Sequence, residues 1–390
     1  MSTVKSCYKD YCVGCGLCEA VKMAICNEDE KGFMHPFNGD EDWFKKVCPS
    51  GGIQQQCMDF QNIWGRTKEV YYGWSTNCSI RQVASSGGVI TEIASWMLES
   101  KNADAVLHIC ADPQDPTKTI CCESTSREEL TSRSGSRYAI SHPLKDISLI
   151  DVSKRYVFIG KPCDVVALRN YMKINEKLRK GIVLILSFFC AGVPSIHAQD
   201  NLLKHLQCSK EELVSLKYRG DGWPGYTTAV DKHGKIYQTD YATSWGKILG
   251  RDIMKMCRFC LDGIGEMADI SCGDAWYLTP DKKPDFTEAE GRNVIFARTD
   301  IGKNLLDAII KDGRLQVTPT TVDDLKYIQT YQWDRRATMV DKMLAMRLFG
   351  KSFPKYKLGN LLKYSKTVPI KRHYAIFKGT IKRILCRKIN

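Results

Sequence analysis

The sequence predicts an α/β protein with a cysteine-rich segment before the α/β domain and a basic helical tail after it. Strand-like and helix-like stretches alternate through the middle of the chain, which is typical of helices that cover a sheet. Cysteines at metal-binding spacing lie near the start, and basic residues gather at the end. These observations divide the 390 residues into three predicted parts, which are 1–60, 61–330 and 331–390.

The first part contains Cys12, Cys15 and Cys18, and Cys48 follows directly before a proline. Three cysteines at C-x2-C-x2-C spacing, with a remote Cys-Pro, are typical ligands of a [4Fe–4S] cluster. Glycines between these cysteines allow the loop to fold closely around a cluster, because glycine accepts backbone angles that other residues resist. Residues 1–60 are therefore predicted to form a ferredoxin-like [4Fe–4S] segment.

Alternatives to this assignment stay open. Cys26 is closer in sequence than Cys48 and competes with it as the fourth ligand, although the proline favours Cys48. Zinc usually takes paired C-x2-C knuckles, so three cysteines in one short run favour the cubane. Ferredoxins with two clusters carry a further cysteine where this chain has Lys22, so one cluster is expected here. Without a recognisable secretory signal peptide, we expect an intracellular protein rather than a disulfide framework.

The middle of the chain is predicted from its hydrophobic periodicity. Its apolar runs are too short to span a membrane, which needs about 20 residues. Strands are expected at 70–74, 105–110, 155–159, 182–189, 269–272 and 294–298, with a hairpin at 226–240. Helices are expected at 89–98, 128–132, 165–178, 195–206 and 301–312. This alternation predicts a mixed α/β domain over residues 61–330.

Four cysteines of the middle domain stand where the fold could bring them together. Cys163 and Cys190 each follow the end of a predicted strand, and Cys257 and Cys260 form a C-x2-C pair. Loops at the carboxyl ends of strands converge on the ligand site in α/β sheets. Four thiolates are enough for a second [4Fe–4S] cluster, and zinc is the less favoured alternative. The other cysteines are interpreted as small buried hydrophobes: Cys78, Cys110, Cys121, Cys122, Cys208, Cys272 and Cys386.

Over most of residues 8–280 the chain resembles the coenzyme F420 hydrogenase/dehydrogenase beta-subunit family. The resemblance rests on the order and spacing of both cysteine sets and of short segments, namely Ser85-Ser86-Gly87-Gly88, Gly135-Ser136-Arg137-Tyr138, Gly160-Lys161-Pro162-Cys163-Asp164, Tyr218-Arg219-Gly220 and Ser271-Cys272-Gly273-Asp274. It implies an α/β flavin-binding domain, FAD and iron–sulfur clusters. The family includes plant 7-hydroxymethyl chlorophyll reductase, and this chain most resembles members from bacterial exopolysaccharide loci.

The resemblance also implies a set of cofactor-binding residues, which are Ser85, Ser86, Gly87, Gly88, Arg137, Tyr138 and Lys161. The Ser-Ser-Gly-Gly turn before a helix could bind phosphate oxygens, although a capped helix explains the same residues. The guanidinium of Arg137 would pair with the pyrophosphate, and the ammonium of Lys161 would lie near the flavin ring. No catalytic residue is assigned, and the acid–base candidates are His142, Asp164, His197 and Asp274.

The net charge of +13 belongs almost wholly to the tail. Residues 351–390 contain twelve Lys or Arg and no acidic residue, whereas the preceding residues contain 45 basic and 44 acidic ones. Phe377, Ile381, Ile384 and Leu385 fit one helical face between basic residues. Such a helix either binds an anionic membrane surface or packs on the body with a solvated basic face. An acidic electron donor is a rival partner. No nucleic-acid binding is expected, because no groove-reading motif accompanies the charge.

The sequence therefore predicts an iron–sulfur flavoprotein oxidoreductase. Electrons from a ferredoxin-like donor would pass through two [4Fe–4S] clusters to FAD and then to an unidentified small organic substrate, in polysaccharide biosynthesis as the resemblance implies. We expect a cytoplasmic location, peripheral to the inner membrane face if the tail binds lipid. The alternatives are an electron-transfer subunit that serves a partner enzyme and a zinc-bearing interaction protein with a basic tail.

Overall fold

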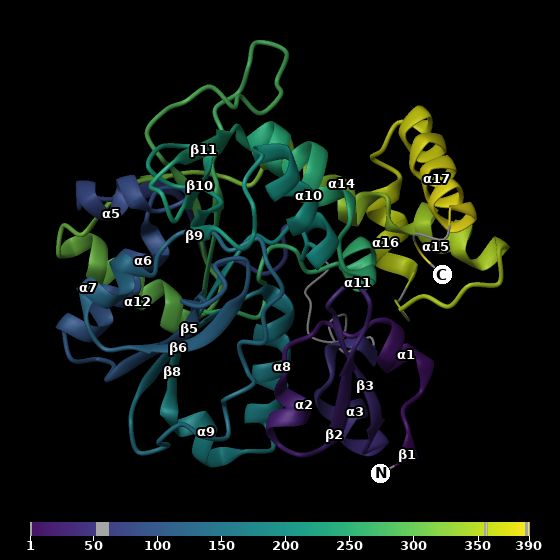
Figure 1. Ribbon diagram of the computed structural model, residues 1–390, viewed down its shortest axis with the longest axis horizontal. Coiled ribbons are helices and arrows are strands. Elements are labelled where there is room, and N and C mark those ends of the chain that lie inside the picture. Colours follow the sequence, from purple (N-terminus) through teal and green to yellow (C-terminus); the bar gives the residue numbers. More distant parts are fainter. Residues whose placement is uncertain (1, 52–61, 355, 357, 387–388, 390) are drawn as a thin grey trace.

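The computed structural model describes residues 2–51, 62–354, 356, 358–386 and 389 (Figure 1). Its central sheet consists of β4 (Glu69–Ser75), β5 (Ala105–Ala111), β6 (Thr119–Ser124), β7 (Tyr156–Gly160), β8 (Ile182–Phe188), β12 (Ile270–Asp274), β13 (Asn293–Ala297) and β14 (Leu315–Pro319). The eight strands lie in the order β14-β4-β13-β12-β8-β7-β5-β6. β12, β8, β7 and β5 pair in parallel, and the outer strands pair antiparallel. The fold is thus mixed α/β, as predicted.

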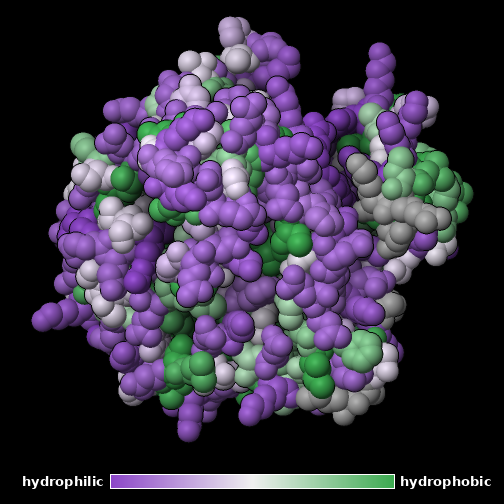
Figure 2. All heavy atoms as spheres, in the orientation of Figure 1, coloured by the Kyte–Doolittle hydropathy of each residue, from purple (hydrophilic) through white to green (hydrophobic). Residues whose placement is uncertain are grey.

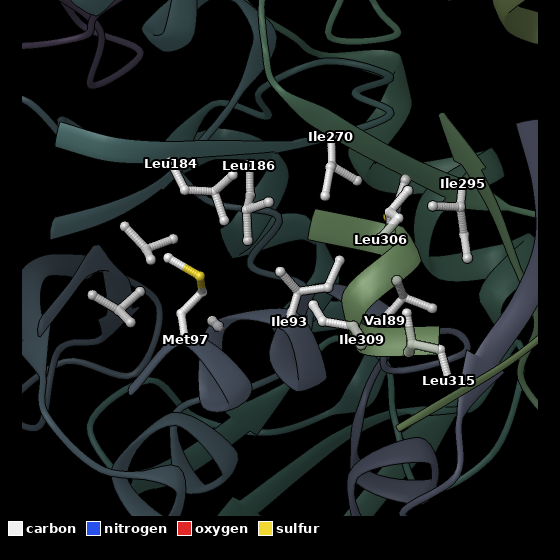
Figure 3. Close-up of a cluster of buried hydrophobic side chains, with 14 of the residues drawn as sticks. Val89, Ile93, Met97, Leu184, Leu186, Ile270, Ile295, Leu306, Ile309 and Leu315 are labelled. Carbon is white, nitrogen blue, oxygen red and sulfur yellow. The ribbon is translucent and has the colours of Figure 1, made fainter. Parts of the chain in front are cut away.

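Helices cover both faces of this sheet. They are α5 (Cys78–Val83), α6 (Val89–Glu99), α7 (Arg127–Ser132), α8 (Pro162–Met172), α9 (Glu176–Gly181) and α12 (Asp300–Lys311). On one face, Ile93 of α6 and Leu306 of α12 pack in a cluster with Leu184 and Leu186 of β8 (Figure 3). On the other face, helices α8 and α9 pack against the next residue of that strand, Ile185. Successive side chains of a strand point to opposite faces, so β8 supplies both cores.

The predicted elements are found within a few residues of their expected bounds, with one exception. The helix expected at 165–178 is two helices, α8 and α9. Helix α8 begins earlier than expected because Pro162 occupies its first turn, where the missing N–H costs nothing. It ends at Met172, and the side chain of Asn175 then caps α9 by accepting a hydrogen bond from the N–H of Leu178 at 3.0 Å.

A second, smaller sheet contains the predicted hairpin. Its antiparallel strands are β9 (Leu213–Lys217), β10 (Thr227–Asp231) and β11 (Ile236–Thr239), and helix α10 (Ile196–Leu206) packs on them. The chain then forms a π-helical turn, η2 (Ala242–Ile248), a short 3-10 turn, η3 (Leu249–Arg251), and helix α11 (Lys255–Phe259). Helix α11 carries Cys257, and Cys260 follows at its end.

The N-terminal part is a separate three-stranded antiparallel sheet in the order β1-β3-β2. It comprises β1 (Ser2–Thr3), α1 (Ser6–Asp10), α2 (Leu17–Ala20), β2 (Ala24–Glu28), β3 (Met34–Gly39), α3 (Glu41–Val47) and the 3-10 turn η1 (Pro49–Gly51). Leu17 and Val47 pack in the same core as α8, so this part is attached to one face of the central sheet. Residues 52–60 of the predicted segment lie outside the described residues.

The C-terminal part is helical, drawn in yellow at the right of Figure 1. Its helices are α13 (Leu325–Ile328), α14 (Thr330–Ala337), α15 (Met339–Leu348), α16 (Leu358–Ser365) and α17 (Ile370–Leu385). Ile384 is buried against Met343 of α15, so helix α17 packs on the body. Phe377 and Ile381 are half-buried, whereas Leu385 is exposed. The apolar stripe predicted for the tail therefore faces mostly inward, and the basic side chains face solvent. Within the described residues, no helix is both long and apolar enough for a membrane crossing.

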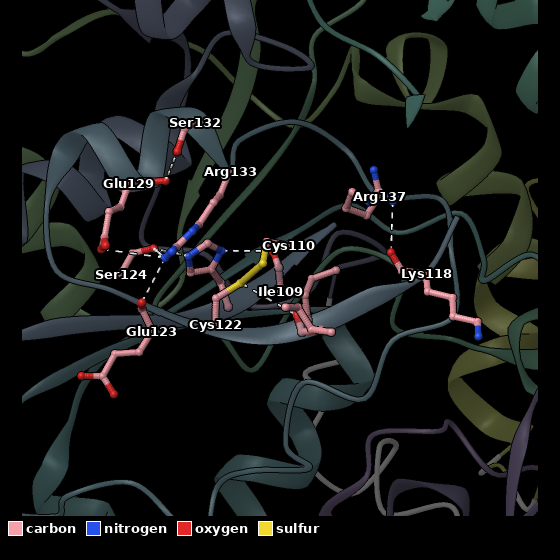
Figure 4. The surroundings of a disulfide bond; sticks show 12 residues. Ile109, Cys110, Lys118, Cys122, Glu123, Ser124, Glu129, Ser132, Arg133 and Arg137 are labelled. Atoms are coloured by element: carbon pink, nitrogen blue, oxygen red, sulfur yellow. Dashed lines mark hydrogen bonds and ion pairs between the residues drawn. A yellow bond between two sulfur atoms is a disulfide. The ribbon is translucent and has the colours of Figure 1, made fainter. Parts of the chain in front are cut away.

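The cysteines interpreted as small buried hydrophobes differ from one another in burial and in bonding. Cys110 and Cys122 instead form a disulfide between β5 and β6 (Figure 4). The register explains this, because His108 lies opposite Cys122 and Ile120 lies opposite Cys110, which makes the two cysteines diagonal neighbours. The interpretation is also wrong for two exposed cysteines, Cys78 and Cys386. It is confirmed for Cys208 and Cys272, which are buried, whereas Cys121 is half-buried.

Candidate functional site

A cavity of about 730 Å³ opens at the carboxyl ends of β7, β8 and β12. Gly160, Phe189 and Gly273 line it at these strand ends. This is the edge at which ligands bind in α/β sheets. The volume lies within the range of about 300–1,000 Å³ that is usual for small-molecule and cofactor sites.

The predicted Ser-Ser-Gly-Gly turn lies on one wall of this cavity. Ser85, Ser86 and Gly88 line it, together with the first turn of α6, whose N–H groups have no intrahelical partner. Gly88 has a φ of +74°, which favours glycine. Gly87 lies behind the wall, where a Cβ would approach Asn293 Oδ1 to 2.8 Å. A helix N-terminus at a cavity wall is an anion-binding arrangement, which fits the phosphates of a dinucleotide.

Arg137 and Tyr138 also line the cavity, but the guanidinium of Arg137 is already engaged. It donates hydrogen bonds to the backbone carbonyls of Leu216 at 2.8 Å and of Lys118 at 3.2 Å, and a further one to that of Pro116. These bonds leave no forked pair of N–H groups for a phosphate, so the predicted pairing with a pyrophosphate would require Arg137 to move. Arg133, which the sequence did not single out, lies on the same wall and donates to Ser124 Oγ at 2.8 Å (Figure 4).

A buried ion pair lies at the deepest wall, where β7 meets α8. Lys161 Nζ is 2.9 Å from Asp164 Oδ2 and donates to Ser141 Oγ at 2.8 Å. Burial opposes the charge on Lys161, but the attraction of Asp164 and of the thiols of Cys163 and Cys190 outweighs burial and raises the pKa of Lys161. Asp164 Oδ1 is buried and has no hydrogen-bond partner among the described residues. A ligand N–H would satisfy this oxygen.

An aromatic wall, made of Tyr241, Trp245, Trp276 and Phe286, faces the same cavity. Arg219 pairs with both carboxylate oxygens of Asp274 at 3.0 and 3.1 Å and lies 4.8 Å from the centre of the Tyr241 ring. The π-helical turn η2 supplies Trp245, and turns of this kind are frequent at functional sites. Sequence analysis missed this wall, because isolated aromatic residues far apart in the chain carry no spacing signal.

Only two of the four acid–base candidates lie at the cavity. Asp164 and Asp274 line the cavity, whereas His142 and His197 do not. His142 Nδ1 lies 2.7 Å from the carbonyl oxygen of Gly14 and belongs to the surroundings of the first cysteine set. His197 is exposed at the start of α10. Asp274 is held by Arg219 and by the indole N–H of Trp223 at 2.8 Å, so its contacts are those of a fixed ion pair.

The first cysteine set surrounds a small cavity in the N-terminal part. Cys12, Cys15, Cys18, Cys26 and Cys48 all line it, so the structure brings both candidate fourth ligands to the same place. Burial raises the pKa of the Cys15 thiol to about 12 and that of Cys48 to about 11. The loop that carries the first three cysteines contains glycines with φ of +65° and +82°. A bound metal centre removes the thiol proton, and its charge would offset the burial of the resulting thiolates.

Neither the sequence nor the geometry decides which cysteine is the fourth ligand of this set. Cys26 Sγ lies 3.7 Å from Cys18 Sγ, and the hydrogen bond between these sulfur atoms lowers the pKa of Cys26. Cys48 instead acts electrostatically on Cys12 and Cys15, and its proximity raises the pKa of both thiols further. The choice between Cys26 and Cys48 therefore stays open.

The second cysteine set is also brought together. Cys163 begins α8, Cys190 follows β8, and Cys257 and Cys260 come from α11 and its end. Beyond the effect of burial, Cys190 and Cys260 each raise the pKa of the Cys163 thiol. Each set brings at least four thiols together, which is the number of cysteine ligands that a [4Fe–4S] cluster takes.

The two cysteine sets flank one apolar cluster. Cys15 and Cys163 both pack against it, and its buried members include Tyr11 and Phe259. These two rings meet edge to face, with their centroids 5.8 Å apart, and each is the chain neighbour of a cysteine. The C-terminal part completes the cluster with Met339, Met343 and Tyr356. This role of the C-terminal part could not be predicted from its sequence.

A cavity at the carboxyl ends of parallel strands, together with two sets of half-buried thiols, is an arrangement suited to redox chemistry. Comparison with family models specifies the class of protein. Residues 70–147 match the model described as "Coenzyme F420 hydrogenase/dehydrogenase, beta subunit N-term", and residues 153–323 match the corresponding C-terminus model. The chain belongs to this family, which confirms the resemblance read from its motifs.

Several relatives are similar over most of the chain. The chloroplastic 7-hydroxymethyl chlorophyll a reductase of Oryza sativa is 25% identical over 84% of this chain and 68% of its own length. The coenzyme F420 hydrogenase subunit beta of Methanococcus voltae is 24% identical over 67% of this chain and 88% of its own. A chain of the F420-reducing [NiFe] hydrogenase complex from Methanosarcina barkeri shares the fold, with a TM-score of 0.58 and 18% identity over 76% of this chain and 98% of that chain. The two named relatives are an oxidoreductase and a subunit of one, which supports an oxidoreductase role here.

His108 provides a test of the electrostatics of the cavity. It is buried on β5, its Nε2 lies 2.8 Å from Ser124 Oγ, and burial, with a smaller effect of Arg133, lowers its pKa to about 4. Between pH 6.5 and 4 the unfolded chain therefore binds a proton that the folded chain does not, so stability is lost as pH falls. From pH 7 to pH 5, we expect the wild type to lose about 2 kcal/mol more unfolding free energy than His108→Gln.

Urea denaturation at the two pH values measures this difference. The matched control is the exposed His197→Gln, which should lose stability with pH as the wild type does. Equal losses of unfolding free energy in the wild type and in His108→Gln would show that His108 is not held neutral by burial.

Proposed function

We propose that the protein is an iron–sulfur flavoprotein oxidoreductase, which passes electrons from a ferredoxin-like donor through two [4Fe–4S] clusters and FAD to a small organic substrate. The observation that carries this proposal is the placement of two half-buried thiol sets around one apolar cluster, together with a cavity large enough for a dinucleotide. The relatives named as a hydrogenase subunit and a reductase support the same class.

Two sets of four thiolates would hold the clusters. The first comprises Cys12, Cys15, Cys18 and Cys48, with Cys26 as the alternative fourth ligand, and the second comprises Cys163, Cys190, Cys257 and Cys260. The first turn of α6 and the turn at Ser85 and Ser86 would receive the phosphates of FAD. When bound, the clusters supply one-electron transfer, and the flavin supplies the change to two-electron chemistry.

The chain's own residues would set the electrostatics of the cavity. The ammonium of Lys161, held by Asp164 at 2.9 Å, keeps a positive charge at the deep wall, where negative charge on a reduced ring system would be stabilised. The free oxygen of Asp164 would accept a ring N–H. The Arg219–Asp274 ion pair lies against the Tyr241 ring and would hold the aromatic wall in place.

The substrate is proposed only by class. The aromatic wall suits a small organic molecule with an apolar face, and the resemblance to members from exopolysaccharide loci points to polysaccharide biosynthesis. The alternative is an electron-transfer subunit without a substrate of its own, which is favoured by relatives named as beta subunits of hydrogenase and of formate dehydrogenase. Reoxidation of the reduced flavin by a candidate substrate, without a partner protein, would separate the two.

Protein purified without oxygen should carry about eight irons and one flavin, because each of two cubanes contains four irons. Iron and acid-labile sulfide assays measure the clusters, and the absorption spectrum measures the flavin. Stoichiometric zinc together with the absence of flavin absorbance would overturn the proposed function.

Cys15→Ser and Cys260→Ser should each remove one cluster and leave the other, because the two thiol sets come from different parts of the chain. Electron paramagnetic resonance of the reduced variants reports each cluster. The exposed Cys78→Ser is the matched control and should keep both signals. Cys48→Ser should remove the first signal and Cys26→Ser should not, and the reverse result would make Cys26 the ligand. Loss of both signals from either first variant, with the chain still folded, would refute the ligand assignment.

The basic face of α17 is the proposed contact with an anionic partner. Lys378 and Lys382 are exposed on it, and Leu344 and Leu348 are exposed on the contacting helix α15. Figure 2 shows hydrophobic surface among the C-terminal helices at the right of the view. Deletion of the tail would also remove the buried Ile384, so a change of surface charge is the cleaner test.

A Lys378→Gln, Lys382→Gln double variant should bind anionic vesicles roughly tenfold or more weakly at low salt than the wild type. The reason is that each lysine near an anionic surface contributes about 1 kcal/mol of binding free energy. The difference in vesicle affinity between the variant and the wild type should be smaller at high salt, because salt screens the charges. Vesicle sedimentation measures it, and Lys177→Gln, Lys180→Gln on α9 is the control with the same charge change. Unchanged vesicle binding with slower reduction by ferredoxin would instead identify the tail as a docking surface for an acidic donor.

A further inference from the structure

Helix α14 lies beyond the match to the family models, which ends at residue 323, yet it contacts the second cysteine set. Arg335 of this helix is buried, with 4% of its surface exposed. Its guanidinium donates to the carbonyl oxygen of Cys190 at 3.1 Å and to that of Ala191 at 2.8 Å. It thus binds the backbone of the loop that presents one thiol of the second set.

Two further residues of α14 hold the same loop. Gln332 Nε2 donates to the carbonyl oxygen of Cys190 at 3.0 Å, and Tyr331 Oη donates to that of Ala191 at 3.0 Å. The close approach requires a glycine at position 263, because a Cβ there would lie 2.5 Å from Arg335 Nη1. Gly263 in turn accepts a hydrogen bond from the N–H of Cys190 at 2.8 Å. The loop is therefore fixed from both sides.

The buried charge of Arg335 lies beside the loop that carries Cys190 rather than beside a carboxylate. Among the described residues, no acidic side chain forms an ion pair with Arg335, whereas its neighbour Arg336 pairs with Glu266. Lys161, two residues before Cys163, is a second buried cation near the set, but it is paired with Asp164.

We infer that Arg335 is a positioning residue for the second cluster, which fixes the Cys190 loop and raises the reduction potential of that cluster. The inference rests on the proposed function. A buried positive charge stabilises the reduced form, which carries one more negative charge, and in a low-dielectric site this stabilisation is large. The C-terminal helices thereby add a buried cation to the one that Lys161 supplies from the family-matched part of the chain.

The test is an anaerobic redox titration of the full-length protein, with the two clusters followed by electron paramagnetic resonance. In Arg335→Gln, the second cluster should become harder to reduce. The equilibrium constant for sharing one electron between the two clusters should change about tenfold in favour of the first. A tenfold change for a one-electron couple corresponds to about 59 mV. Arg335→Lys keeps the charge and should keep most of the wild-type potential, and the first cluster should not shift in either variant.

Arg372→Gln is the matched control, because Arg372 is a cation of the same C-terminal part that pairs with Asp334 and does not contact the loop. An unchanged potential of the second cluster in Arg335→Gln, or an equal shift of both clusters, would overturn the inference and leave the proposed function intact. Loss of the second signal in both Arg335 variants would show a purely structural role and also overturn it. Absence of a second cluster in the wild type would overturn the proposed function itself.

Discussion

The arrangement of the molecule depends on the convergence of three parallel strand ends, those of β7, β8 and β12. Parallel pairing brings the carboxyl ends of these strands to one edge of the sheet, and the segments after them carry the chemistry. Lys161 and Cys163 follow β7, Cys190 follows β8, and Asp274 ends β12. Two cysteines of the second set, a buried ion pair and one wall of the cavity thus share a single structural origin.

This convergence buries ionisable groups, which is unfavourable for their charged forms. Buried side chains of opposite charge nearby offset part of this effect. Desolvation disfavours ionised thiols and carboxylates, as the raised pKa values of the thiols in both sets indicate. Lys161 and Arg335 are two buried cations near the second set. The first set lacks an equivalent buried guanidinium among the described residues that surround its cavity, and glycines and a histidine lie there instead. The two sites are therefore electrostatically unequal, which favours different potentials for the two proposed clusters.

Six of the eight central strands, the two cysteine sets and the serine–glycine turn could be predicted from sequence because each leaves a local signature, whereas the edge strands β6 and β14 were missed. Cys163 and Cys190 were placed together from one rule, that loops after parallel strands converge. The contacts of Arg137 with backbone carbonyls could not be foreseen, because they depend on where distant strands end. Arg335 and the aromatic wall were missed for a related reason: a single arginine or tryptophan has no spacing that distinguishes a site from a core. The Cys110–Cys122 disulfide depends on the register of β5 and β6, which the sequence does not specify.

The C-terminal helices do more than extend the chain. They join the N-terminal part to α11 through one apolar cluster, in which the ring of Tyr11 meets that of Phe259. The phenol of Tyr11 donates to the carbonyl oxygen of Ser352, and Tyr356 Oη donates to that of Phe259 at 2.5 Å, so both rings are tied to the same C-terminal segment. Because each ring is the chain neighbour of a cysteine, this segment links the two parts of the chain that carry the thiol sets. A segment outside the family models thus connects the proposed redox centres and, through Arg335, adds positive charge beside one of them.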